Sequence, residues 1–332
     1  MPESVDDQAE EPREQAAEPP QGEPETGAWP GELMRLAERD VFVRTSDHAG
    51  GRAAPHGRNV YLHGLAGSST NWTELMGLLG EEFPGAAVDL PGFGESPAPA
   101  DGDYRLDAQA ECVVDLISRG GRPVNLVGNS MGGSLAVRIA AEHPELVRTL
   151  VLVSPALPDL YPRLVPYQMT SALVPVIGPA VFARMQSRPP EVRVQGTFDA
   201  TYFDPAAVPM RRVREALRAE QAREALSYAN VATLKTLRSL VAEYLRRGPR
   251  GLWRQAAEVR CPAMLVYARH DKFIHPRMAV RAARTFSKGH LVLLSKAGHV
   301  AMMERPDVLA ERIRPFLRDA ARLEPGAVHR IT

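Results

Sequence analysis

Residues 124–136 decide the fold, and they read Val-Asn-Leu-Val-Gly-Asn-Ser-Met-Gly-Gly-Ser-Leu-Ala. The opening run is rich in Val and Leu and predicts a buried strand, and a helix-compatible segment begins at Ser134. Between them, Ser130 lies in the pattern G-x-S-x-G with Gly128 and Gly132. Glycine is needed at both positions because a serine on so tight a turn leaves no room for neighbouring Cβ atoms. The stretch therefore predicts a strand, a sharp turn with the serine at its tip, and a helix.

Strands and helices alternate on both sides of this turn. Further strands are predicted at residues 59–62, 86–89, 146–153, 263–267 and 291–294. Helices are predicted at residues 106–119, 134–143, 252–258, 276–286 and 308–317. Alternation at this spacing predicts a mainly parallel sheet with helices on both faces. Before it, residues 33–44 are expected to form a short helix and an edge strand.

The alternation stops between residues 155 and 250, where only helical periodicity and prolines occur. We interpret this segment as a helical cap inserted into the α/β core, whose two parts cover residues 33–154 and 251–323. Residues 1–32 carry ten acidic side chains and one basic, and they have little to bury. Such a segment cannot offset its ordering entropy and is predicted to be a disordered acidic tail. Residues 324–332 are predicted to be a C-terminal tail.

Charge and cysteine content favour a cytoplasmic protein. The chain holds 40 basic and 40 acidic residues, and we expect no nucleic-acid partner. Cys112 and Cys261 lie outside any CxxC or Cys/His cluster, so we expect buried, reduced thiols. The N-terminus lacks the succession of a secretory signal.

Residues 164–183 are uncharged over the length of a membrane span, but Pro166, Pro175 and Pro179 would break a helix repeatedly. We expect no transmembrane segment here. A lid of short apolar helices is favoured, with weak contact to a lipid surface left open.

Three side chains follow predicted strands in the order needed for nucleophilic catalysis. A serine hydroxyl needs an adjacent base, and that base needs a third group to orient it. Asp271 and His299 each lie just past the carboxyl end of a strand, downstream of Ser130. The sequence therefore predicts a catalytic triad of these three residues. Asp159 is the alternative acid, and His270 is interpreted as a structural neighbour.

The same chemistry needs hydrogen-bond donors aimed at the developing oxyanion. The N–H of Met131, directly after the serine, is one candidate. The second is the N–H of Leu65, in the loop after the strand at 59–62, where Gly64 allows close approach of the backbone. His63 is interpreted as a side chain that braces this loop.

These motifs together resemble the α/β-hydrolase superfamily over residues of roughly 35 to 320. The resemblance is carried by residues 63–65, 89–96 and 128–133, by Asp271, and by residues 298–299. It implies an eight-stranded, mostly parallel sheet, a cap over the active site, and no metal or organic cofactor. A serine at position 130 argues against haloalkane dehalogenases and epoxide hydrolases, which carry aspartate there.

The elbow Gly-Asn-Ser-Met-Gly-Gly is similar to that of hydrolases that cleave carbon–carbon bonds in aromatic ring-cleavage products, and Asn129 fits this comparison. The same elbow also occurs in esterases and lipases. We expect a carboxylic ester hydrolase acting on an apolar small-molecule substrate. Carbon–carbon bond hydrolysis is the alternative enzyme, and a small-molecule receptor or scaffold is the non-enzyme alternative.

Overall fold

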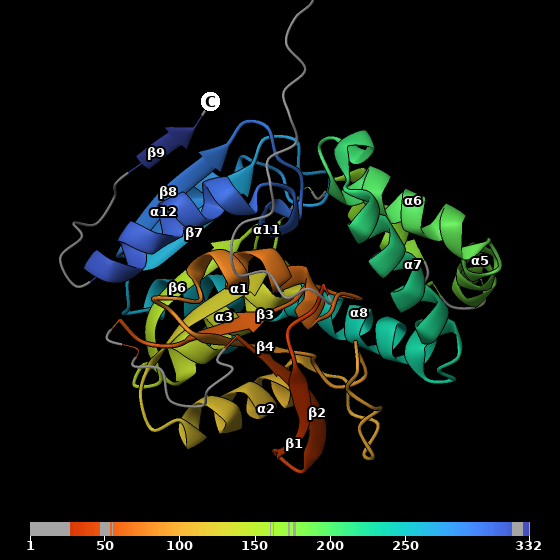
Figure 1. The fold of residues 1–332 in the computed structure, drawn as a ribbon, viewed down its shortest axis with the longest axis horizontal. Helices are drawn as coiled ribbons and strands as arrows, with labels where there is room; N and C mark the ends of the chain where they lie inside the picture. Colours follow the sequence, from red (N-terminus) through yellow and green to blue (C-terminus); the bar gives the residue numbers. More distant parts are fainter. Residues whose placement is uncertain are drawn as a thin grey trace, which may run out of the picture.

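The computed structural model describes residues 27–46, 54, 56–159, 161, 163–171, 173–174, 177–320 and 328–331. Of these, residues 167, 168, 177, 179 and 328–331 are described by their backbone alone. One sheet runs through the protein in the strand order β1-β2-β4-β3-β5-β6-β7-β8-β9 (Figure 1). Its strands are β1 Gly31–Leu36, β2 Arg39–Thr45, β3 Asn59–Leu62, β4 Gly85–Val88, β5 Val124–Asn129, β6 Val147–Val153, β7 Ala263–Ala268, β8 Gly289–Leu294 and β9 Val328–Ile331.

The sheet is mostly parallel, as predicted. Only the pairs β1–β2 and β2–β4 are antiparallel, and every other neighbouring pair is parallel. All six residues of β5 are buried, and so are all six of β7. Strands that are covered on both faces need continuous apolar runs, which explains the Val- and Leu-rich sequence before Ser130.

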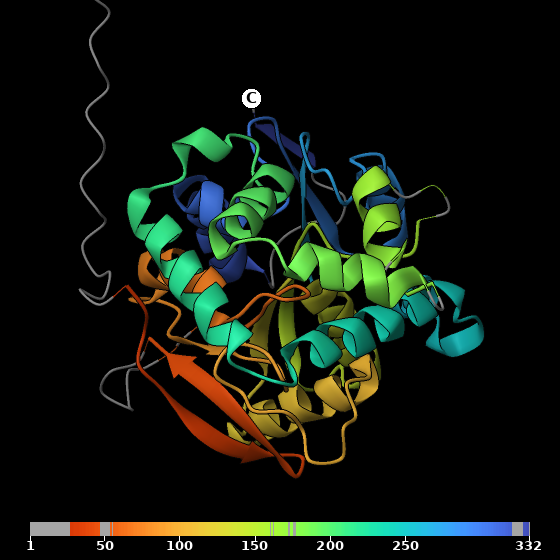
Figure 2. The same ribbon diagram turned by 90° about the vertical axis from the view of Figure 1, so that its right-hand side faces the viewer.

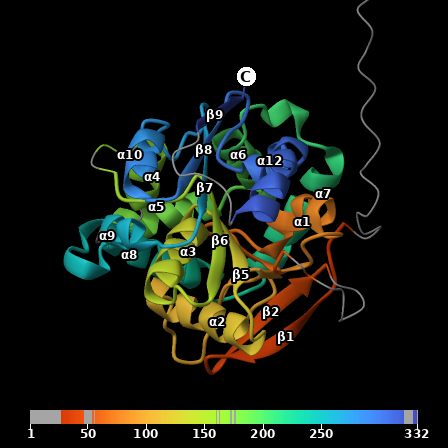
Figure 3. The ribbon, with the colours of Figure 1, turned by 90° about the vertical axis from the view of Figure 1, so that its left-hand side faces the viewer.

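Helices cover both faces of the sheet (Figure 3). One face carries α2 Leu106–Arg119, α3 Met131–Glu142, α9 Leu252–Glu258 and α10 Met278–Thr285. The other carries α1 Thr73–Leu79, which follows the 3-10 turn Ser69–Trp72, together with α11 Ala301–Glu304 and α12 Pro306–Asp319. The predicted bounds of α2 and α9 are confirmed to the residue.

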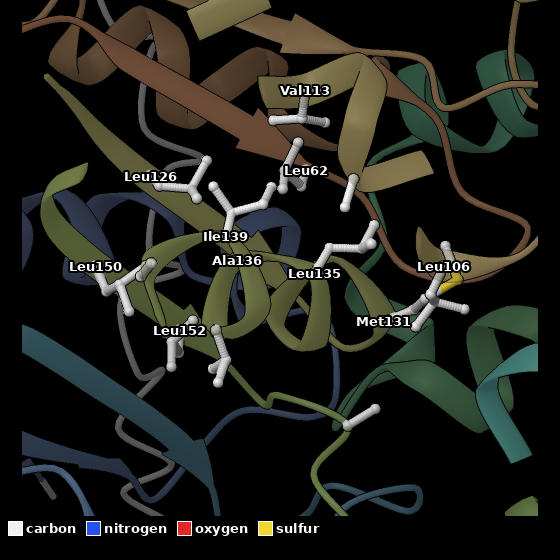
Figure 4. Close-up of a cluster of buried hydrophobic side chains, with 14 of the residues drawn as sticks. Leu62, Leu106, Val113, Leu126, Met131, Leu135, Ala136, Ile139, Leu150 and Leu152 are labelled. Carbon is white, nitrogen blue, oxygen red and sulfur yellow. The ribbon is translucent and has the colours of Figure 1, made fainter. Parts of the chain in front are cut away.

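The helix after the serine turn packs directly onto the sheet (Figure 4). Leu135 and Ile139 of α3 are fully buried in the same apolar cluster as Leu126 of β5 and Leu150 of β6. Burying a leucine side chain stabilises a fold by about 2 kcal/mol. This cluster therefore holds the first turn of α3 at the carboxyl end of β5.

The prediction of a short helix within residues 33–44 was wrong. This segment is a β-hairpin of β1 and β2, joined at Ala37 and Glu38 with φ of 43° and 59°. Two successive residues with positive φ form the turn whose twist matches a hairpin. The helix-favouring residues Leu33, Met34 and Arg35 are overridden because β2 pairs with β4 and extends the sheet.

Part of each predicted tail belongs to the fold. Trp29 lies inside the predicted N-terminal tail, yet it is buried in the core, and its indole N–H donates to the Thr73 carbonyl oxygen at 3.0 Å. The indole supplies the apolar area that the rest of this segment lacks. Residues 1–26 lie outside the described residues. Near the C-terminus, β9 pairs with β8 and adds a ninth strand to the eight that the resemblance implies.

The described part of residues 155–250, the segment for which the sequence predicts a cap, contains five α-helices between β6 and α9. They are α4 Leu164–Ser171, α5 Ile177–Gln186, α6 Pro190–Thr201, α7 Met210–Glu224 and α8 Ala229–Leu245. Figure 2 shows them gathered on one side of the sheet. None of the helices in the described part of the chain has the length and apolar character to cross a membrane.

A buried ion-pair cluster joins α8 to the helix after the serine turn. Arg138 of α3 is 1% exposed and pairs with Glu243 of α8, which is 2% exposed. The other terminal nitrogen of the Arg138 guanidinium is 2.5 Å from a carboxylate oxygen of Asp107 in α2. Arg246 lies 3.3 Å from each of the two carboxylates. Because buried charges are tolerated only when they are paired, this cluster fixes α8 against α3.

We predict that Arg138→Met lowers the free energy of unfolding by about 3 kcal/mol, because it leaves the buried Glu243 carboxylate short of a partner. The double variant Arg138→Met/Glu243→Leu should be less destabilised than the single variant. Urea unfolding followed by circular dichroism measures both. Equal or greater destabilisation of the double variant would contradict this interpretation of the pair.

Candidate active site

Ser130 occupies a strained turn between β5 and α3. Its φ of 52° and ψ of −116° are unusual for a residue with a side chain. Its N–H donates to the Val153 carbonyl oxygen at 3.1 Å, and its carbonyl accepts from the N–H of Ala156 at 2.9 Å. The end of β6 and the residues after it therefore hold the turn in place.

The two glycines of the pattern are required by close backbone contacts. A Cβ atom on Gly128 would lie 2.4 Å from the carbonyl oxygen of Gly132. One on Gly132 would lie 2.3 Å from the carbonyl oxygen of Leu62, at the end of β3. A larger residue at position 132 would push the turn away from β3, and one at position 128 would clash within the turn itself. Both contacts agree with the steric reason inferred for these glycines.

Asp271 and His299 meet above the carboxyl ends of β7 and β8. The imidazole Nδ1 of His299 lies 2.9 Å from Oδ2 of Asp271, and both residues are buried. The other oxygen of Asp271 accepts from the N–H groups of Phe273 at 2.8 Å and Ile274 at 2.9 Å. The carboxylate thus holds the ring with Nδ1 protonated, so that Nε2 is the basic nitrogen.

These contacts set the ionisation of the carboxyl. Burial alone would raise the pKa of Asp271, but the neighbouring His299 and the hydrogen bonds to the ionised form hold that pKa below its ordinary value. Asp271 is therefore a carboxylate at neutral pH.

Asn129 connects the serine turn to the histidine loop. Its buried side-chain N–H₂ donates to the carbonyl oxygens of Val153 at 3.0 Å and His299 at 3.1 Å. Because Asn129 directly precedes Ser130, one side chain brings the serine turn and the histidine loop together. This structural role accounts for the asparagine within the elbow.

The two predicted oxyanion donors belong to segments that adjoin the serine. The N–H of Met131 is the first of α3. Leu65 follows Gly64, where an added Cβ would lie only 3.2 Å from the Cβ of Ser130. Gly64 is therefore the contact that lets the loop after β3 approach the serine so closely.

His63 braces this loop, as the sequence analysis inferred. Its Nδ1 lies 2.7 Å from the carbonyl oxygen of Gly64, and its Nε2 accepts from the N–H of Leu90 at 3.0 Å. Full burial lowers the pKa of His63, so the ring is neutral and both nitrogens are used in structural hydrogen bonds.

The alternative acid lies elsewhere. Asp159 pairs with Arg277 at 2.8 Å, whereas Asp271 is the carboxylate that contacts His299. The ring of His270 packs against Phe203 of the inserted segment, with 4.3 Å between the centroids. The structure thus places Asp271, and not Asp159, against His299, and it places His270 against Phe203.

Two contacts of the loops that carry Asp271 and His299 were not predicted from the sequence. Phe273 stacks on the His299 imidazole with 4.6 Å between ring centroids, and Glu304 accepts from the N–H of Gly298 at 2.7 Å. They lie two positions after Asp271 and five after His299, and proximity in sequence was the only available signal. Among the described residues, no cluster of His, Cys, Asp and Glu could hold a metal ion.

A family model described as the alpha/beta hydrolase fold matches residues 60–306. The chain therefore belongs to the α/β-hydrolase fold family, and it is a hydrolase.

Two relatives and one solved structure illustrate the similarity. Lipase 1 of Psychrobacter immobilis is 25% identical over 263 residues, which cover 77% of this chain and 75% of the relative. 2-Hydroxymuconate semialdehyde hydrolase of Pseudomonas sp. (strain CF600) is 34% identical over 141 residues, which cover 41% and 46%. The crystal structure of a putative lipase from Acinetobacter baumannii shares the fold with a TM-score of 0.74 at 19% identity, covering 89% of this chain and 93% of that one.

We predict that ionised Asp271 stabilises the fold in a pH-dependent way. Its pKa is depressed in the folded state relative to about 3.9 in the unfolded chain. The stabilisation is therefore present above the unfolded value and is lost as the pH falls through the folded one. The advantage of wild type over Asp271→Asn in unfolding free energy should shrink as the pH is lowered from about 5.

Urea unfolding between pH 7 and about pH 3 measures this difference, because the loss falls between the unfolded and the folded pKa of Asp271. Glu311→Gln, at an exposed carboxylate on α12, is the control and should show no such trend. A gap between wild type and Asp271→Asn that widens towards acid pH would contradict the prediction.

Proposed function

We propose that this hydrolase cleaves carboxylic esters through an acyl-enzyme on Ser130. The observation that carries the proposal is the buried Asp271–His299 pair, tied through Asn129 to a serine on a strained turn. A serine becomes nucleophilic when a neutral imidazole accepts its proton, and the carboxylate stabilises the imidazolium that forms.

The proposed reaction has two halves, acylation of Ser130 and hydrolysis of the acyl-enzyme, and His299 acts in both. Nε2 of His299 accepts the Ser130 proton as Oγ bonds to the acyl carbon, and the carbonyl electrons move onto the oxygen. The N–H groups of Leu65 and Met131 donate to that oxyanion. Collapse breaks the ester bond, and the imidazolium protonates the departing alcohol. Water, deprotonated by His299, then attacks the acyl carbon. When this second intermediate collapses, the bond from the acyl carbon to Oγ breaks, the imidazolium returns the proton to Oγ, and the acid leaves free Ser130.

We propose an apolar substrate under a cap formed by residues 155–250. The five helices of this segment carry several exposed apolar side chains, among them Leu164 and Met185. Lipase 1 of Psychrobacter immobilis, whose sequence aligns with most of this chain, supports an ester substrate. We propose a cytoplasmic location, since both cysteines are unpaired thiols in the structure.

We expect wild type to react with a fluorophosphonate probe and to hydrolyse short p-nitrophenyl esters. Ser130→Ala should lose the labelling and at least about a thousandfold in kcat, because the nucleophile is gone. Ser134→Ala is the matched control, because the buried Ser134 hydroxyl donates to the Ala156 carbonyl oxygen at 2.7 Å. A folded wild type that neither labels nor hydrolyses esters would refute the proposal.

Carbon–carbon bond hydrolysis is the second candidate. It is supported by the 34% identity to 2-hydroxymuconate semialdehyde hydrolase over 141 residues. Turnover of a ring-cleavage dienone by wild type, with kcat/KM above that for every ester tested, would favour this reaction over ester hydrolysis.

We further propose weak contact between the cap and a lipid surface. Leu164 is 69% exposed and Met185 is 50% exposed, and Arg184 and Arg188 are exposed within three positions of Met185 in the sequence. Exposed apolar side chains flanked by arginines favour an anionic lipid surface.

Leu164→Gln/Met185→Gln should therefore lower the rate on an ester dispersed in anionic vesicles several-fold and leave the rate on a short soluble ester unchanged. Leu245→Gln, at a 74% exposed position on α8, is the control. Equal rates of the double variant and wild type on vesicles would contradict the contact.

A further inference from the structure

The end of α6 contacts the two loops that carry the predicted base and its acid. We call residues 199–204 the α6 end. The N–H of His299 donates to the Thr201 carbonyl oxygen at 2.6 Å. In the other loop, the ammonium group of Lys272 donates to the carbonyl oxygen of Asp199. One short stretch of the inserted helices therefore contacts the loops of both Asp271 and His299.

The contact with the histidine loop is backbone against backbone. A Cβ atom on Gly298 would lie 2.3 Å from the Thr201 carbonyl oxygen and 2.7 Å from the Phe203 nitrogen. Position 298 therefore has no space for a side chain while the α6 end is in place. Any shift of the α6 end would act directly on the residue that precedes His299.

The carboxylate of Glu304 joins these two segments from a third. Its Oε1 accepts from the N–H groups of Phe203 at 2.9 Å and Asp204 at 3.0 Å. Its Oε2 accepts from the N–H of Gly298 at 2.7 Å. Hydrogen bonds to an ionised acceptor are roughly twice as strong as neutral ones. Glu304 ends α11, which begins two residues after His299, so it is held close to the loop that it orients.

Aromatic rings also pack between the α6 end, the Asp271 loop and the His299 loop. The ring of Phe203 lies 4.3 Å from that of His270, and the ring of Phe273 lies 4.6 Å from that of His299. His299 is thus held in three ways. Asp271 contacts one ring nitrogen, Phe273 stacks on the ring face, and the α6 end accepts the backbone N–H of His299.

We propose that Glu304 is a positioning residue for the hydrolysis, which it serves by clamping the α6 end of the cap to the His299 loop. The inference rests on the proposed triad and adds to it a coupling between cap and base. The imidazole is in its working position only while the α6 end is docked, because the same carboxylate holds both partners. Glu304 itself contacts backbone N–H groups of the protein and does not act on the substrate.

Glu304→Gln tests this coupling. The carboxamide keeps one acceptor oxygen, and its N–H₂ group must face N–H donors on the other side. We expect kcat per active site, counted by fluorophosphonate titration, to fall about tenfold or more, with KM within about twofold of wild type. Glu191→Gln, at an exposed carboxylate in the first turn of α6, should behave as wild type.

Gly298→Ala tests the same contact from the other side, since its Cβ would force the loop and the α6 end apart. It should also lower kcat more than KM changes. This variant decides the question if Glu304→Gln does not fold. Thermal unfolding of each variant separates loss of stability from loss of turnover, because a purely structural role leaves kcat per titrated site unchanged.

Wild-type kcat per site in Glu304→Gln, or in Gly298→Ala, would overturn the inference while leaving the proposed hydrolase intact. A folded wild type that is inert towards both the probe and the esters would overturn the proposed function and the inference together.

Discussion

The backbone at Ser130 must turn from a fully buried strand into a helix at one residue that has a side chain and a positive φ. Such a conformation costs of order 1–3 kcal/mol and persists only where the surroundings hold it. Here they do so through hydrogen bonds to Val153 and Ala156 and through the close passage of Gly132 over the end of β3. The parallel order of β3, β5 and β6 is what supplies these partners side by side.

Around this turn, buried side chains hold the loops of the candidate site through hydrogen bonds to backbone groups at or just beyond the strand ends. The Asn129 side chain donates hydrogen bonds to the carbonyl oxygens of Val153 and His299. The neutral ring of His63 uses both nitrogens in hydrogen bonds. Nδ1 donates to the Gly64 carbonyl oxygen, and Nε2 accepts from the N–H of Leu90. The loops of the candidate site are thus held by two buried side chains that each make two hydrogen bonds to backbone groups.

The inserted helices are attached to the sheet by charge as much as by apolar contact. Arg138 and Glu243 join α8 to α3, and Arg211 of α7 lies 2.8 Å from Glu74 of α1. Glu304 is the third such carboxylate, and it differs because its partners are backbone N–H groups next to His299. Attachments of this kind have a defined geometry, whereas apolar packing alone allows sliding.

What the sequence by itself determined is the set of elements and the chemistry that follows each strand. The glycines around Ser130, the apolar runs of β5 and β7, and the polar residues Asp271 and His299 could be identified because spacing and periodicity are local properties. The fold class and the parallel sheet followed from their alternation.

The tertiary structure alone decided which segments meet. Residues 31–36 form a strand, against their helical preference, because they pair with the edge of β2 that β4 leaves open. Trp29 joined the core because Thr73 and the apolar residues around it offer its indole a site. The contacts of Thr201 with His299 and of Glu304 with Phe203 join residues about a hundred positions apart. Such pairings depend on how the chain packs, and no periodicity in the sequence records them.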